Sequence, residues 1–506
     1  MVDNLRSPPL PPPSGSLATG PSVWQFARAS RAHVVIDAAD YFAAMKDAML
    51  AARQQILLIG WDFDTRMLLG SPRQWWTGAG RKRWPARLGG FVIWLCKRRP
   101  KVRVRVLKWK FAAIRFLFRG SMIIDLVRWY LHPGITFRFD SAHPLGCSQH
   151  QKIGVIDDRF AVCGGIDMTS DRWDTPEHRE ADPRRRRPFG RRLYGPWHDL
   201  AMMVEGDAAE ALAELGRERW EQAGGRPLRP CQPQRETAWP ERISAEFTDV
   251  EIGIARTRSA WNGLPEIREI EALFLEHIAR ARRFIYAESQ YFASRRIAEA
   301  IASRLTCPDP PEIILINPLT AEGWLEQAAM DGARVRLCRA IAEVDPHNRF
   351  RIYIPRNAAG TPIYVHSKLM IVDDEVLRVG SANMNNRSLG LDSEADLFID
   401  AARPGNAHAV AAIASLRHRL LGEHIGMPAD AVATELAAHG SMAQLIEAAP
   451  RGGKRLDAFV LRPLTEAGKA LADNALLDPE RPEHLFEPFS KRRGLFRRGG
   501  LLRRPR

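Results

Sequence analysis

The sequence is poor in cysteine and has no long hydrophobic run. These two features argue against a disulfide-rich or zinc-ribbon protein and against a membrane-spanning helix. Six cysteines are scattered among 506 residues, with no CxxC pair. A disulfide framework or a zinc ribbon is therefore not expected, and buried thiols in a reduced, cytoplasmic compartment fit best. No stretch of about 18 uncharged apolar residues occurs, so we expect any membrane contact to be peripheral, on the inner face of the membrane.

The first residues lack the apolar segment of a secretory signal peptide. They read MVDNLRSPPLPPPSGSLATG and are rich in Pro, Ser and Gly. Such a composition cannot form a packed core, and we expect residues 1–33 to be disordered.

Acidic residues are fewer than basic ones, 59 against 74, which gives a net charge of +15. This charge predicts attraction to an anionic partner. Membrane lipid and nucleic acid both satisfy that condition, so charge alone does not choose between them.

A pattern of the form H-x-K-x4-D occurs twice. The first copy contains His150, Lys152 and Asp157, and the second contains His366, Lys368 and Asp373. At the same distance after each histidine comes a pair of small residues and then an acid or an amide. These later positions are Gly164, Gly165 and Asp167 in the first copy and Gly380, Ser381 and Asn383 in the second. Two matches in one register indicate an internal duplication.

The duplication extends beyond the motif. Residues 40–55 have apolar residues at helical spacing and are followed by an apolar strand at 56–64, and residues 265–292 repeat this arrangement. A helix near 86–98 and a strand at 102–109 are matched by a helix near 324–333 and a strand at 312–318. Helices alternating with strands predict an α/β protein of two repeats, each a mixed sheet flanked by helices.

Changes in composition suggest where the segments begin and end. The stretch 232–247 is polar and contains proline, and Ala-rich helices begin after about residue 425. We expect a first repeat at 34–231, a linker at 232–247, a second repeat at 248–425, and a helical extension with a basic tail at 426–506.

The motif residues suit a phosphodiester. On a strand, side chains alternate between the two faces, so His150 and Lys152 should point the same way and Asp157 the other way. The same holds for the second copy. Histidine and lysine then form a cationic face, and the motif aspartate is expected to be structural rather than a partner of its own histidine.

Hydrogen-bond donors should carry much of the catalysis, because a phosphodiester gains negative charge in the transition state. Lys152, Lys368 and Asn383 are the candidate donors. Asp167 stands where the second copy has Asn383, and an ionised carboxylate cannot donate. We expect Asp167 to pair with a lysine or an arginine instead.

Each catalytic histidine needs a carboxylate on its second ring nitrogen to fix the tautomer. Aligning the strand at 197–206 with that at 393–400 places Asp199 opposite Glu394. We expect Asp199 to orient His150, with Glu394 as its counterpart in the second repeat.

This pattern resembles the phospholipase D superfamily, in which two repeats pack face to face as a pseudo-two-fold pair and each supplies half of one site. The resemblance covers roughly residues 34–425. The stretches GGIDMTSDRWD, PWHDL, AESQYF and IYVHSK look like phospholipase D proper. The resemblance implies that His150 is the nucleophile and that His366 acts first as acid and then as base.

The resemblance further implies cleavage or exchange of a glycerophospholipid head group through a phosphohistidine, with water or a primary alcohol as acceptor. No cofactor and no metal are expected, because the lysines replace the cation that would otherwise polarise the phosphoryl oxygens. We expect a monomer. The candidate substrate-binding residues are Gly165, Asp167, Trp173, Gln290 and Ser381.

Three alternatives stay open. A phosphatidyltransferase of the cardiolipin synthase type shares the histidine chemistry but usually has N-terminal membrane helices. A nuclease of the superfamily would also explain the positive charge, although small members often carry one motif and dimerise, so nucleic acid is the less favoured partner. A non-enzymatic scaffold that binds anionic lipid would be expected to have lost a histidine or a lysine. The arginine-rich loop at 182–192 and the basic tail are either lipid contacts or solvated surface charge.

Overall fold

The computed structural model describes residues 20–70, 84–110, 122–188, 192–234, 236–321, 324–461 and 478. The strands and helices of its first half, in chain order, are β1 (Gln25–Ile36), α1 (Ala38–Ala51), β2 (Gln55–Gly60), α2 (Leu88–Arg98), β3 (Arg103–Trp109), α3 (Met122–Tyr130), β4 (Ile135–Asp140), β5 (Ile153–Ile156), β6 (Phe160–Gly164), β7 (Trp197–His198), β8 (Leu200–Gly206) and α4 (Asp207–Gln222).

The second half repeats this order and adds elements at its end. Its elements are β9 (Phe247–Arg258), β10 (Ile267–Arg268), α5 (Glu269–Arg280), β11 (Phe284–Glu288), α6 (Arg295–Leu305), β12 (Glu312–Ile316), α7 (Trp324–Ala342), β13 (Phe350–Arg356), β14 (Tyr364–Val365), β15 (Leu369–Val372), β16 (Val376–Gly380), the π-helix η3 (Arg387–Leu391), β17 (Glu394–Asp400), α8 (Ala409–Ile425), α9 (Ala429–His439), α10 (Met442–Ala448) and β18 (Arg455–Ala458).

Most of these strands form one mixed sheet, 16-stranded within the described residues, in which the two halves mirror each other. From β1 outward the order is β8, β6, β5, β2, β3 and β4, and from β9 outward it is β17, β16, β15, β11, β12 and β13. Strands β1 and β9 pair antiparallel and join the halves. The predicted fold class, a duplicated α/β repeat, is confirmed.

Three strands at the outer part of each half run parallel: β2, β3 and β4 in the first, and β11, β12 and β13 in the second. Parallel neighbours need a crossover connection, which the helices between these strands supply. Helix α6, not the helix predicted near 324–333, therefore corresponds to α2. The predicted match was wrong because it reversed the order of helix and strand in the second half.

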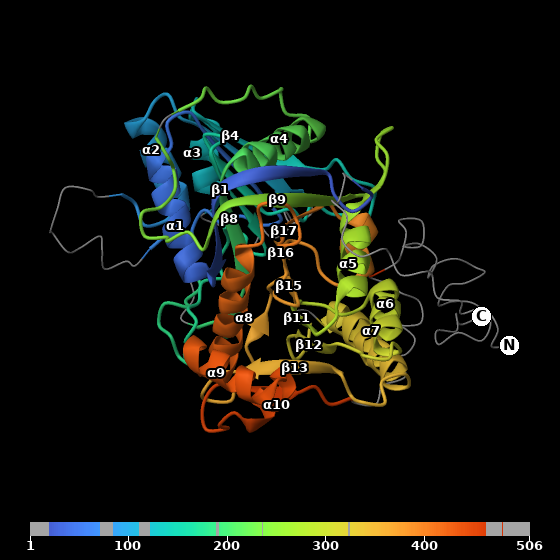
Figure 1. The fold of residues 1–506 in the computed structure, drawn as a ribbon. Coiled ribbons are helices and arrows are strands. Elements are labelled where there is room, and N and C mark those ends of the chain that lie inside the picture. Colours follow the sequence, from blue (N-terminus) through green and yellow to red (C-terminus); the bar gives the residue numbers. More distant parts are fainter. Residues whose placement is uncertain are drawn as a thin grey trace, which may run out of the picture.

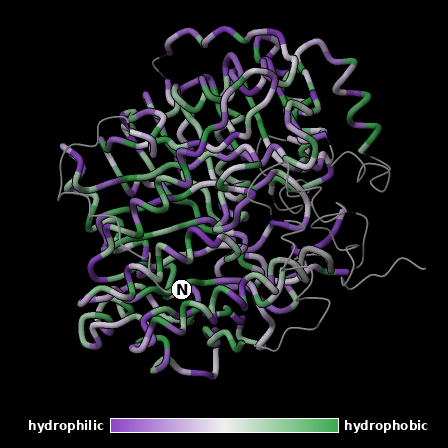
Figure 2. Tube along the Cα trace, turned by 90° about the vertical axis from the view of Figure 1, so that its right-hand side faces the viewer, coloured by the Kyte–Doolittle hydropathy of each residue, from purple (hydrophilic) through white to green (hydrophobic). Residues whose placement is uncertain are grey.

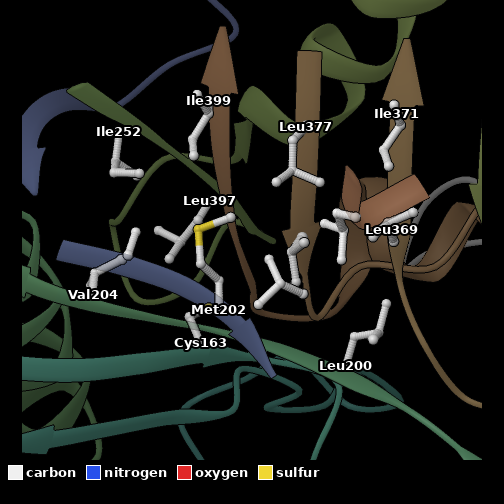
Figure 3. Close-up of a cluster of buried hydrophobic side chains, with 14 of the residues drawn as sticks. Cys163, Leu200, Met202, Val204, Ile252, Leu369, Ile371, Leu377, Leu397 and Ile399 are labelled. Carbon is white, nitrogen blue, oxygen red and sulfur yellow. The ribbon is translucent and has the colours of Figure 1, made fainter. Parts of the chain in front are cut away.

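The molecule buries three main hydrophobic clusters. Two lie between the sheet and the helices that cover it, and the third lies between the two halves of the sheet. Helices α1, α2 and α3 cover the outer face of the first half, and α5, α6 and α7 cover that of the second (Figure 1). Between the halves, side chains of β6 and β8 meet those of β15, β16 and β17 (Figure 3). Strands β2, β12 and β15, which are covered on both faces, are almost continuously apolar. Figure 2 shows hydrophobic stretches running through the interior of the molecule.

The chain boundaries differ from the sequence prediction at both ends. Strand β1 begins at Gln25 and lies at the centre of the sheet, so residues 25–33 are not disordered. Residues of β1 alternate between buried and less buried positions, but this pattern was overlooked because a proline-rich segment precedes the strand. The C-terminal extension is helical, as predicted, but β18 also adds a strand next to β13. The basic tail, from about residue 490, lies outside the described residues.

In the part of the chain that the structure describes, no helix combines the length and apolar character needed to cross a bilayer.

Candidate active site

The two H-x-K segments meet where the halves of the molecule join, and each is held by the opposite half. The backbone N–H of His150 donates to the carbonyl of Ser393 at 2.9 Å, and that of His366 donates to the carbonyl of His198 at 2.8 Å. Next to His366, strands β7 and β14 form a separate two-stranded parallel pair. The predicted strands were placed too early, since Lys152 and Lys368 come just before β5 and β15.

Each histidine is oriented by a carboxylate of the other half. The Nδ1 atom of His150 lies 2.9 Å from both carboxylate oxygens of Glu394. The Nδ1 atom of His366 lies 2.7 Å from Oδ2 of Asp199. The prediction that Asp199 orients His150 was therefore wrong. The acids themselves were correctly identified, and the exchange arises because each motif segment pairs with the acid-bearing strand across the junction.

The two acids are buried but held differently. Glu394 accepts hydrogen bonds from the hydroxyls of Ser381, at 2.5 Å, and Ser388, at 2.7 Å. Asp199 has a glycine opposite it, because a Cβ at Gly165 would lie 2.0 Å from its Oδ1. Gly165 thus lies beside the shorter acid, Asp199, and Ser381 lies beside the longer acid, Glu394. The difference between Gly165 and Ser381 was already visible in the sequence.

Burial sets the protonation of these pairs. Burial, together with the ammonium groups of Lys152 and Lys368, holds the pKa of His150 well below its usual value. The pKa of His366 is lowered in the same way, by burial and by Lys368 and Arg172. Burial raises the pKa of Asp199 to about 7 and that of Glu394 to about 8, although the lysines oppose the rise. Neutral imidazoles with Nδ1 toward an acid leave both Nε2 atoms available for chemistry.

Both motif lysines are almost completely buried. The ammonium of Lys152 donates to the carbonyl of His150 at 3.0 Å and lies 3.6 Å from Oδ2 of Asp167. The predicted pairing of Asp167 with a cation is confirmed. Lys368 donates to the carbonyl of His366 and, at 3.3 Å, to Oε1 of Gln290, which places that candidate residue in the site.

Asn383 is also buried, and its Oδ1 has no hydrogen-bond partner among the described residues. An amide presents a donor as well as an acceptor, so this side chain can meet a phosphoryl oxygen. The role of Asn383 as a donor to phosphate stays a prediction.

Two residues of the site were not among the site residues predicted from the sequence. The guanidinium of Arg172 lies over the ring of Trp197, 4.0 Å from its centroid, and Arg172 helps to lower the pKa of His366. Trp197 also stacks on Tyr364 at 4.6 Å and lies 5.2 Å from His366. The only sequence signal for either was its place in the stretches that carry the resemblance.

The motif aspartates lie away from the histidines, in equivalent places. Asp157 follows β5 with φ of 52° and accepts hydrogen bonds from the backbone N–H groups of residues 53, 54 and 55. Asp373 has φ of 56° and accepts from residues 282, 283 and 284. Their predicted structural role agrees with these contacts. The strand-alternation argument does not apply, because both lie in turns.

Trp173 and the arginine-rich loop make contacts within the chain. The guanidinium of Arg184 lies 4.5 Å from the ring centroid of Trp173, whose backbone carbonyl accepts a hydrogen bond from Tyr194. Arg184 and Arg185 form ion pairs with Asp182 and Asp174, and Arg187 with Asp171. Residues 189–191 lie outside the described residues. The predicted role of Trp173 in substrate binding is not supported by these contacts, which are of a packing kind.

The geometry and charge of the site suit an anionic ester. Three cations, Lys152, Lys368 and Arg172, lie around two histidines, whose Nε2 atoms can attack phosphorus or, once protonated, deliver a proton. Such a site can stabilise charge on the non-bridging oxygens of a phosphodiester while one histidine displaces the leaving group.

Comparison with known proteins agrees with this geometry. The family model described as "Phospholipase D" matches residues 336–466. Phospholipase D1 of Schizosaccharomyces pombe is 27% identical over 404 residues, covering 59% of this chain and 29% of the relative. Phospholipase D alpha 1 of Carica papaya is 25% identical over 398 residues, covering 55% of this chain and 49% of the relative. The chain thus spans less than half the length of these curated relatives.

Among solved structures, the phosphatidylserine synthase of Haemophilus influenzae Rd KW20 superposes with a TM-score of 0.52 over 83% of this chain and 96% of that chain, at 11% identity. At this identity the likeness concerns the fold.

Proposed function

Since the chain belongs to the phospholipase D superfamily, we propose that it is a phospholipase D-type phosphodiesterase that hydrolyses or exchanges the head group of glycerophospholipids. The observation that carries the proposal is the pair of crossed histidine–carboxylate contacts, His150 with Glu394 and His366 with Asp199. A scaffold that only binds lipid has no need for two oriented, neutral imidazoles among buried lysines.

In the first step, Nε2 of His150 attacks phosphorus and the bond from phosphorus to the head-group oxygen breaks. His366, protonated on Nε2 when the anionic substrate is bound, gives that proton to the departing oxygen. The carboxylate of Glu394 stabilises the positive charge that forms on the His150 ring. Lys152, Lys368 and Asn383 donate to the non-bridging oxygens.

In the second step, His366 takes a proton from water or a primary alcohol, and the resulting oxygen nucleophile attacks phosphorus. The bond between phosphorus and Nε2 of His150 breaks, which releases phosphatidic acid or a phosphatidyl alcohol. The charge balance closes, because the proton given up in the first step returns to His366 in the second.

An exposed apolar surface on α3 supports contact with a lipid surface. Ile123, Ile124 and Val127 are each at least half exposed, and Tyr130 and Leu131 are 87% and 73% exposed. Leu145, which is 75% exposed, lies in the loop that leads to His150. Apolar side chains on the outside of a helix suit peripheral insertion among lipid head groups.

The test is to incubate the purified protein with vesicles of mixed phospholipids plus ethanol and to measure the lipid products by mass spectrometry. We expect phosphatidic acid and phosphatidylethanol. His150→Asn and His366→Asn should each reduce turnover by at least about 10³-fold while leaving the circular dichroism spectrum unchanged. A variant that kept the wild-type rate would exclude the two-histidine mechanism.

The same incubation separates the alternatives. Product formed only when a second lipid supplies the acceptor hydroxyl would indicate a phosphatidyltransferase. Degradation of added nucleic acid with no change in the lipids would replace the proposal by a nuclease.

A further inference from the structure

A second cluster of buried histidines and carboxylates lies beside the active site. Asp37 precedes α1, His178 follows β6 in the chain, His198 belongs to β7 and Glu423 to α8. All four are buried, and one potential ligand atom from each lies within 4.8 Å of the others. We propose that these four side chains bind one zinc ion, which fixes the segment that carries Asp199.

The spacing of the four side chains fits tetrahedral coordination. The Nε2 atom of His178 lies 3.0 Å from Oε1 of Glu423 and 3.6 Å from Oδ2 of Asp37. The Nδ1 atom of His198 lies 2.8 Å from Oε1 of Glu423 and 3.2 Å from Oδ1 of Asp37. Zinc–ligand bonds of about 2.0–2.2 Å place tetrahedral ligands about 3.3–3.6 Å apart, so the cluster needs only small adjustments to enclose the ion.

The other nitrogen of each imidazole contacts a carboxylate. Nδ1 of His178 lies 3.0 Å from Oδ2 of Asp174, and Nε2 of His198 lies 2.8 Å from Oε2 of Glu288. Glu288 is itself held by the hydroxyl of Tyr286, at 2.6 Å. A metal-binding histidine commonly donates its second N–H to such an acid, which leaves the first nitrogen unprotonated for the metal.

The cluster also holds polar atoms that the protein leaves unsatisfied. Nδ1 of His198 and Oδ2 of Asp37 are buried, and neither makes a hydrogen bond of ordinary geometry within the described chain. Glu423 is close enough to His198, but the pair lacks hydrogen-bond alignment. Metal coordination requires only that lone pairs converge, and a cation would satisfy both atoms.

The donor set favours zinc over the harder divalent ions. Calcium and magnesium prefer oxygen ligands, whereas two imidazoles and two carboxylates suit zinc. Four protein ligands leave no open position, which is typical of a structural site. The proposed ion is therefore separate from the chemistry at His150 and His366.

The position of the ion explains what it would do. His198 directly precedes Asp199, and its carbonyl accepts the backbone N–H of His366. Asp37 is joined to Asp199 twice, through its own N–H at 2.9 Å and through its carboxylate, which accepts from the Asp199 N–H at 3.2 Å. The four ligands are thus positioning residues for the Asp199–His366 pair, and none of them belongs to the phosphodiester site.

The test measures metal rather than activity. The full chain is produced in medium supplemented with zinc, dialysed without chelator and measured by inductively coupled plasma mass spectrometry and X-ray absorption. We expect about one zinc per chain with two imidazole ligands. His178→Ala and Glu423→Gln should reduce the bound zinc at least tenfold, Asp174→Asn should weaken binding about 10–100-fold, and the control His408→Gln, on an exposed residue, should keep it.

A measurement on the unaltered protein covers the case in which the variants do not fold. Protein grown with cobalt in place of zinc should show the visible absorption bands of tetrahedral Co²⁺. A folded wild-type protein that holds less than a tenth of an equivalent of zinc, and takes up none from micromolar zinc, would overturn the proposal. Because these readouts need no lipid, a zinc-bearing protein without phospholipase activity would refute the proposed function alone.

Discussion

The Nδ1 atom of His150 lies 2.9 Å from the carboxylate of Glu394, 244 positions further along the chain. His366 contacts Asp199 of the first half in the same way. Neither half of the molecule therefore supplies both its motif histidine and the carboxylate that orients it. The duplicated halves depend on one another for the orientation of the two motif histidines.

The crossed pairs predict that Glu394→Gln behaves like a change at His150, whereas Asp199→Asn behaves like a change at His366. With a p-nitrophenyl phosphodiester, whose leaving group needs no proton, loss of the general acid matters less than loss of the nucleophile. We expect Asp199→Asn to retain a burst of nitrophenol and Glu394→Gln to lose it, with steady-state rates reduced by up to about 10⁴-fold in each. The reverse pattern would indicate that His366 is the nucleophile.

The alkaline side of the pH–rate profile should report Lys368. Burial and the ammonium of Lys152 lower the pKa of Lys368 to about 7, although the Asp199 carboxylate opposes this. The protonated form donates to phosphate, so loss of this proton should lower kcat/KM as pH rises through about 7. In Lys368→Arg the guanidinium stays charged, and any remaining activity should lose this decline. An unchanged alkaline limb in that variant would assign the titration to another group.

The small residues beside the two acids should not be interchangeable. A Cβ at Gly165 would approach the Asp199 carboxylate to 2.0 Å, so Gly165→Ala must displace the group that orients His366. Ser381→Gly removes one hydrogen bond to Glu394 and leaves that of Ser388 in place. Turnover measurements should show a loss of about 10²-fold or more for Gly165→Ala and a smaller loss for Ser381→Gly. Equal effects would contradict the asymmetry.

The motif aspartates should matter for stability rather than chemistry. Asp157 accepts three backbone hydrogen bonds, so Asp157→Asn should reduce the free energy of unfolding by about 2–3 kcal/mol. Urea unfolding measures this change, while kcat of the folded enzyme should stay within about twofold. Asp249→Asn is a matched control, because Asp249 also has a positive φ but is exposed, and it should change stability by less than about 0.5 kcal/mol.

The apolar side of α3 should govern attachment to lipid. Replacing both Ile124 and Val127 by Glu removes apolar area that would be buried in the head-group region, and vesicle sedimentation should show at least about tenfold weaker binding. Val410→Glu changes an exposed residue of α8 and serves as the control. Retained binding by the double variant would place the lipid contact elsewhere on the molecule.

The sequence predicted the elements that the two halves share. It did not predict the contacts between the halves. The two copies of H-x-K were found because their internal spacing is equal, and the acids Asp199 and Glu394 were found because the later strands of the two halves could be aligned. Arg172 and Trp197 were missed as site residues, since one arginine or one tryptophan in a loop has no periodicity to distinguish it. The start of the first repeat was predicted too late, at residue 34, because a proline-rich segment precedes β1.

The sequence by itself determined the duplicated α/β fold and the two cationic motif segments, because hydrophobic periodicity and residue spacing are local properties of the chain. Only the tertiary structure decided which acid serves which histidine, since that depends on β7 pairing with β14 and on the contact of His150 with the segment before β17. It alone also brought Asp37, His178, His198 and Glu423 together. Side chains from four distant segments converge only when the sheet and α8 have packed.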